Sequence, residues 1–105
     1  MHVGVMRLSL HVPHARSLKD KRAVVRRFRD RVRARFDVSI AEVDAQDLLQ
    51  RAVFGVSVVS VDGAICEKLL EQVAHEAETQ PDAVLLDRST EILSFGDELY
   101  GDVDG

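Results

Sequence analysis

The spacing of hydrophobic residues alternates between two periods along the chain, and this alternation limits the possible folds more than any single motif does. A spacing of two residues is typical of a strand with one buried face, and a spacing of three to four residues is typical of an amphipathic helix. The period near two appears over residues 3–12, and the helical period over residues 18–35 and after residue 62. Residues 36–43, with Val38 and Ile40 in one phase, the valine-rich residues 51–61, and residues 83–93 are the other three expected strands. With right-handed crossovers, this order predicts an α+β ferredoxin-like βαββαβ sandwich, in which two helices cover one face of a four-stranded antiparallel sheet.

Residues that suit helix caps stand where the helical period begins. Pro13 should end the first strand, because it has no N–H to donate to a neighbouring strand. Ser17 suits the N-cap of the first helix, with Asp20 three residues later, and Asp62 suits the N-cap of the second. The stripes expected to face the sheet are Leu18, Val25, Phe28 and Val32 in the first helix, and Ile65, Leu69, Val73 and Ala77 in the second.

A chain of 105 residues with 46% hydrophobic content is long enough for one modest core. We expect a single domain over residues 1–95 and a flexible acidic tail over residues 96–105.

The lone cysteine, Cys66, excludes an internal disulfide and a multi-cysteine zinc site. We expect it to be a small buried side chain. No apolar run approaches the roughly 20 residues of a membrane span. We therefore expect a cytoplasmic protein that holds no cofactor.

Charge is divided unevenly along the chain, although the net charge is only −4. Residues 1–35 hold eleven of the fourteen basic residues and two acids, Asp20 and Asp30, which gives this segment a charge of +9. Residues 36–51 carry −3 and residues 52–105 carry −10. A basic segment on an acidic body can act as a local site for a polyanion.

The first helix concentrates this positive charge beside its apolar stripe. Arginine can hold a phosphate with two parallel hydrogen bonds, so such a helix could follow the backbone of structured RNA. The alternative is a solvated helix that is neutralised by acids of the second helix, namely Glu67, Glu71, Glu76 and Glu78. The candidate nucleic-acid-binding residues lie on one flank and are Lys19, Arg22, Arg26, Arg29 and Arg33, while Arg27, Arg31 and Arg35 lie on the other.

Two charged residues are expected to lean toward the core. Lys21 falls near the apolar face of the first helix, and Glu42 shares the phase of Val38 and Ile40 on the second strand. We predict a partly buried structural ion pair between Lys21 and Glu42. No arrangement of residues indicates a catalytic site or a metal site, so an enzyme is not expected.

The sheet face that the helices leave open is expected to carry small and β-branched side chains. It has no aromatic pair on which bases could stack, which argues against nucleic-acid recognition on this face. Uncharged β-branched residues there would suit a homo-oligomer interface formed by Val3, Val5, Val53 and Val59.

Residues 3–93 closely resemble the YlxP-like family of small bacterial proteins, a domain of unknown function. The matching motifs are Val3-Gly4-Val5, Ser17-Leu18-Lys19-Asp20-Lys21-Arg22, Arg35-Phe36, Val38-Ser39-Ile40-Ala41-Glu42-Val43, Asp47-Leu48, Gln50-Arg51-Ala52, Gly55, Val58-Val59-Ser60 and Thr90-Glu91-Ile92-Leu93. The chain departs from the family pattern at Asp37, where asparagine is expected, and past Leu93.

The resemblance implies a ferredoxin-like domain with no established catalytic residues. Members of the family often sit in translation operons, near initiation factor two and a ribosome-binding factor, which implies a role in ribosome assembly or RNA handling. We therefore expect a noncatalytic accessory protein whose basic helix contacts ribosomal RNA or a ribosomal subunit. The alternative is a module that uses the open sheet face, either to form a homo-oligomer such as a homodimer or to bind a small ligand.

Overall fold

The computed structural model describes residues 1–96, so the predicted tail lies outside the described residues except for Gly96. Strands and helices follow the expected order. The second strand begins three residues later than expected, because Phe36 N–H still donates to the helical carbonyl of Val32. The elements are β1 (His2–His11), α1 (Leu18–Arg35), β2 (Ser39–Asp44), β3 (Arg51–Ser60), α2 (Gly63–Glu78) and β4 (Val84–Ser94).

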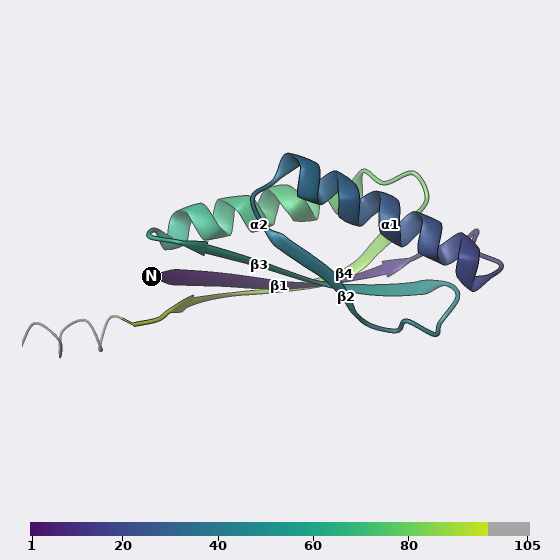
Figure 1. Ribbon diagram of the computed structural model, residues 1–105, viewed down its shortest axis with the longest axis horizontal. Coiled ribbons are helices and arrows are strands. Elements are labelled where there is room, and N and C mark those ends of the chain that lie inside the picture. Colours follow the sequence, from purple (N-terminus) through teal and green to yellow (C-terminus); the bar gives the residue numbers. More distant parts are fainter. Residues whose placement is uncertain (97–105) are drawn as a thin grey trace, which may run out of the picture.

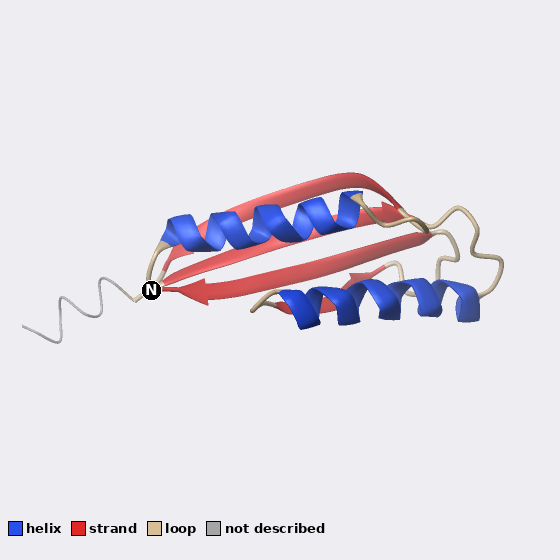
Figure 2. Cartoon of the chain, turned by 90° about the horizontal axis from the view of Figure 1, so that it is seen from above, coloured by secondary structure: helices blue, strands red, loops and turns tan. Residues whose placement is uncertain are grey.

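The four strands form one antiparallel sheet in the order β2-β3-β1-β4. Both helices lie on the same face of this sheet, α2 over β1 and β4 and α1 toward the β2 edge (Figures 1 and 2). Neither α1 nor α2 covers the opposite face, and we call it the open face. The ferredoxin-like α+β prediction is confirmed.

Each helix begins at the residue expected to cap it. Ser17 Oγ accepts a hydrogen bond of 3.1 Å from Asp20 N–H, and Asp62 Oδ1 accepts one of 2.9 Å from Ala64 N–H. These side chains satisfy backbone donors that have no partner inside the helix, which is worth about 1 kcal/mol for each cap. The caps therefore fix where each connection ends and where each helix begins to cover the sheet.

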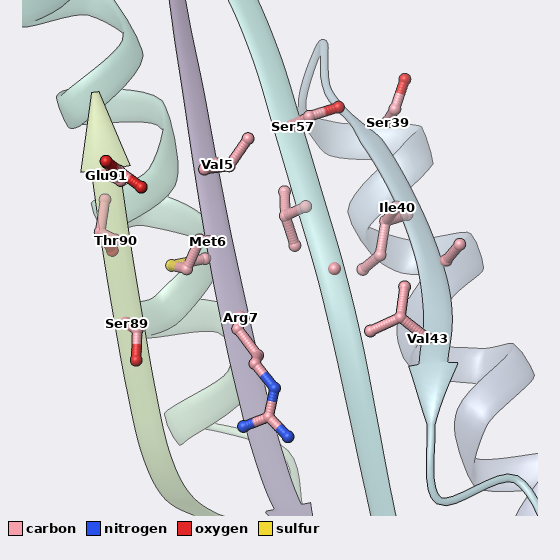
Figure 3. Close-up of a pocket in the computed structure, with 13 residues that line it drawn as sticks. Val5, Met6, Arg7, Ser39, Ile40, Val43, Ser57, Ser89, Thr90 and Glu91 are labelled. Atoms are coloured by element: carbon pink, nitrogen blue, oxygen red, sulfur yellow. The ribbon is translucent and has the colours of Figure 1, made fainter. Parts of the chain in front are cut away.

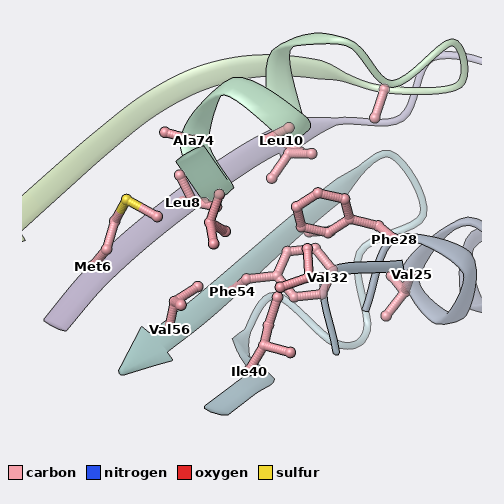
Figure 4. Close-up of a cluster of buried hydrophobic side chains, with 14 of the residues drawn as sticks. Met6, Leu8, Leu10, Val25, Phe28, Val32, Ile40, Phe54, Val56 and Ala74 are labelled. Carbon is pink, nitrogen blue, oxygen red and sulfur yellow. The ribbon is translucent and has the colours of Figure 1, made fainter. Parts of the chain in front are cut away.

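The core lies between the sheet and the two helices (Figure 4). Phe28 of α1 meets Phe54 of β3 edge to face, with 5.0 Å between ring centroids. Large apolar side chains buried this fully contribute roughly 1.5–3 kcal/mol each. As the period of two predicts, the even residues Met6, Leu8 and Leu10 of β1 lie in the core, and Val12 just beyond the strand is buried as well. Ser9, which has an odd position, is also buried.

The predicted stripe of α2 is wrong by one position at its first two turns. Ile65 is 47% exposed and Leu69 is half-buried, whereas Cys66 and Leu70 are fully buried. The cause is Gly4 of β1, whose missing side chain leaves room for these two residues: a Cβ placed there would lie 3.1 Å from Cys66 Cβ and 2.9 Å from Leu70 Cδ1. The helix therefore turns these residues toward the sheet. The prediction of a buried cysteine is confirmed.

Candidate nucleic-acid interface

The two flanks of α1 differ in how their positive charges are compensated. On the flank that faces α2, Arg27 Nη2 lies 2.6 Å from Asp82 Oδ2, and Arg35 Nη1 lies 2.7 Å from Glu76 Oε2. Arg31 Nη1 approaches the other oxygen of Glu76 at 3.7 Å. Each of the three arginines on this flank therefore has a carboxylate beside it.

The other flank, which we call the open flank, consists of Lys19, Arg22, Arg26, Arg29 and Arg33. Arg33 Nη2 donates a 3.0 Å hydrogen bond to the Ile40 carbonyl, and Arg29 Nε lies 3.4 Å from Oδ1 of its neighbour Asp30. Within residues 1–96, no carboxylate pairs with Lys19, Arg22 or Arg26. All three side chains are exposed.

The alternative in which acids of α2 neutralise the basic helix applies to one flank only. Of the four acids considered, Glu76 alone reaches α1 in the described part of the chain. Glu71 instead pairs with Arg88 of β4 at 3.1 Å, and Glu78 lies 3.9 Å from His75 on its own helix. The open flank therefore keeps most of its positive charge facing solvent.

The predicted partners Lys21 and Glu42 are brought together by α1 and β2. Lys21 Nζ lies 3.1 Å from Glu42 Oε2, with the lysine side chain 1% exposed and the glutamate side chain 20% exposed. Lys21 also donates to the carbonyl of Ala45 in the β2–β3 connection. Glu42 Oε2 accepts no well-directed hydrogen bond from residues 1–96, so its contact with the lysine is an ion pair without hydrogen-bond geometry.

The four valines proposed for an interface all have register positions on the open face, but they differ in exposure. Val3 pairs with Val59 and Ser9 pairs with Val53 across β1 and β3. Val59 is 64% exposed, Val5 is exposed and Val3 is half-buried. The prediction that Val53 is available to a partner is wrong, because its side chain is only 3% exposed. It lies at the end of the sheet where the β2–β3 connection runs on the open-face side (Figure 1).

A groove of about 650 Å³ crosses the middle of the open face (Figure 3). At Gly55 of β3 no side chain fills the groove. Val43 forms one side of the groove, at a point where the register of β2 shifts. Arg7 of β1 and Glu91 of β4 supply opposite charges to the lining. Arg7 makes only a long contact of 3.8 Å with Asp44.

Sequence reasoning missed the apolar end of the open face. Leu93 and Phe95 are 45% and 57% exposed, and Val61 is exposed just beyond β3. The signal was the period of two, which places these residues in phase with Val5 and Val59 once the strand register is known.

No three histidine, cysteine, aspartate or glutamate side chains within residues 1–96 come together as a metal site would require. No helix in that part of the chain is long and apolar enough to cross a membrane.

These features define a small α+β sandwich domain with one strongly basic helix flank and one sheet face that neither α1 nor α2 covers. The chain belongs to the family described as "Protein of unknown function (DUF503)", whose model matches residues 3–90. A curated relative is the "Uncharacterized protein YlxP" of Bacillus subtilis (strain 168), which is 41% identical over 71 residues, covering 68% of this chain and 77% of that protein.

Solved structures with a similar shape are distant in sequence and therefore show the fold alone. A de novo designed protein, Foldit4, matches with a TM-score of 0.51 at 12% identity, covering 90% of this chain and 98% of its own. A candidate chlorite dismutase matches with a TM-score of 0.52 at 18% identity, covering 99% of this chain and 48% of its own.

Proposed function

We propose that this protein is a noncatalytic accessory factor that contacts ribosomal RNA, free or within a ribosomal particle, through the open flank of α1. The observation that supports this proposal is the contrast between the two flanks. Carboxylates stand beside Arg27, Arg31 and Arg35, while Lys19, Arg22 and Arg26 face solvent with no such partner in residues 1–96.

The open flank has the length and chemistry that an RNA backbone requires. Arg22 and Arg33 are eleven residues apart, which corresponds to about 16 Å along a helix axis. Over this distance the arginines and Lys19 present donors that suit phosphate oxygens. Because these contacts read charge and shape, the protein would select structured RNA by its backbone and not by base sequence.

The remainder of the protein would restrict the contact to this flank. Residues 52–105 carry −10, and the acids of α2 and β4 repel a polyanion approaching from other directions. The groove in the middle of the open face is lined by no aromatic side chain of residues 1–96 on which bases could stack. The choice of ribosomal RNA over other structured RNA follows from the family resemblance.

A pair of charge reversals tests the proposal. Arg26→Glu removes one unpaired positive charge from the open flank, and Lys68→Glu makes the same charge change on α2, where Lys68 is also exposed. In fluorescence anisotropy with a folded ribosomal RNA fragment, we expect Arg26→Glu to weaken binding by about tenfold and Lys68→Glu by less than about twofold. Equal effects of the two variants, or no binding by the unaltered protein at low salt, would overturn the proposal.

A further inference from the structure

An uncharged apolar surface occupies the end of the open face where β1 begins and β4 ends. We call it the apolar patch, and its members come from three adjacent strands and their ends: Val3, Val5, Val59, Val61, Leu93 and Phe95. The register joins them, because Val3 pairs with Val59 on one side and with Leu93 on the other. Phe95 N–H continues the ladder by donating to the Met1 carbonyl at 2.8 Å.

The patch is larger than isolated exposed side chains would explain. Val59 and Phe95 are more than half exposed, and Leu93 is close to half exposed. With these exposed fractions, the six side chains together expose several hundred Å² of apolar surface. Patches of about 300–600 Å² are the largest on typical monomers and commonly mark contact sites.

We infer that the apolar patch is the centre of a two-fold interface with a second copy of this chain, in which the open faces pack against each other. In a two-fold interface, residues near the axis face their own counterparts, so a charge there would meet a like charge. None of the six patch residues is charged. The nearest charges lie at its edges: the Met1 ammonium group donates a 3.0 Å hydrogen bond to the Phe95 carbonyl, and Glu91 is one step along β4 from Leu93 on the same face. Arg7 lies farther along β1.

The apolar patch would supply part of the area that a stable dimer needs, and the rest of the open face would supply the remainder. A standard interface buries about 800 Å² on each partner. The patch supplies the apolar centre, and the adjoining groove adds further apolar surface together with the polar side chains of Ser39, Ser57 and Glu91. The helices lie on the opposite side of each sheet, so two chains joined in this way form four layers, helices outside and sheets inside. This inference concerns the open face and does not depend on RNA binding by α1.

Analytical ultracentrifugation of the full chain tests this interface. At about 50 μM we expect a mass of twice 11.7 kDa for the unaltered protein. Val59→Glu and Leu93→Glu change different strands of the patch and should each give the mass of one chain. Ile65→Glu is the matched control, because Ile65 is 47% exposed on α2, away from the open face, and it should remain a dimer.

Two results would overturn the interface. One is a monomeric unaltered protein at this concentration, which would leave the patch to a different partner. The other is a dimer that persists in both Val59→Glu and Leu93→Glu, which would place the contact elsewhere. Circular dichroism checks that each variant is folded, and using two strands keeps the test decisive when one variant fails to fold.

Discussion

Lys21 of α1 and Glu42 of β2 form an ion pair at the edge of the core, with 3.1 Å between Nζ and Oε2 and the lysine side chain 1% exposed. The same ammonium group donates to the carbonyl of Ala45. A helix, an edge strand and the connection that follows it are thus joined at one charged group. Because α1 also carries the open flank, this contact helps to hold that flank in place relative to the sheet.

Lys21→Met should destabilise the fold. The substitution keeps the length and apolar stem of the side chain but leaves Glu42 and the Ala45 carbonyl without their cation. We expect a loss of about 2–3 kcal/mol, below the usual cost of breaking a buried pair because Glu42 is partly exposed. Urea denaturation measures the loss.

Two further variants serve as controls for the Lys21→Met measurement. Lys19→Met makes the same chemical change at an exposed position of α1 and should alter stability by less than about 0.5 kcal/mol. Lys21→Met/Glu42→Leu removes both charges and should recover part of the loss. A Lys21→Met protein as stable as Lys19→Met would show that the pair contributes nothing.

Gly4→Ala should push α2 away from the sheet. The new Cβ would lie 2.9 Å from Leu70 Cδ1 and 3.1 Å from Val58 Cγ1, both in the packed core. Overpacking of this kind costs about 1–3 kcal/mol, and thermal melting should detect it. In the control Gly55→Ala, the closest atom is Val43 Cγ1 at 3.0 Å, on an exposed side chain that can move. Equal losses in the two variants would contradict this explanation.

Ala45→Gly should stabilise the protein. Ala45 has φ of 59°, in the left-handed region where a side chain is unfavourable and glycine is not. We expect a gain of about 0.5–1 kcal/mol in the free energy of unfolding. Ala34→Gly, at an exposed position of α1, should lose a similar amount. A loss of stability in both variants would mean that the backbone at Ala45 carries no strain.

The salt dependence of RNA binding should report the number of phosphate contacts. Arg22→Ala/Arg26→Ala removes two contacts, so the slope of log K against log salt should decrease in magnitude by about 1.5. Lys68→Ala should leave the slope unchanged. A slope that is the same in all three proteins would show that Arg22 and Arg26 do not touch phosphates.

Local patterns were sufficient to predict the elements, the caps and the core face of β1. Ser17 and Asp62 act within one helical turn, and the even residues of β1 alternate in one strand, so no distant contact is needed to place them. The approach of Lys21 to Glu42 also followed from phase, because each residue leans inward on its own element.

Features that depend on contacts between distant segments were not predictable in the same way. Val53 is buried at the end of the sheet where the β2–β3 connection lies on the open-face side, and its own strand gives no sign of this. Cys66 replaces Ile65 in the core because α2 fits over Gly4, which is far away in the sequence. The uneven compensation of the two α1 flanks depended on where Glu76 and Asp82 came to lie.

The most direct test of the proposed function is co-sedimentation of the protein with ribosomal particles at low and near-physiological salt. We predict that the unaltered protein travels with one subunit, that salt weakens this association steeply, and that Arg22→Glu/Arg26→Glu abolishes it while Lys68→Glu does not. A protein that stays at the top of the gradient at both salt concentrations would contradict ribosome contact.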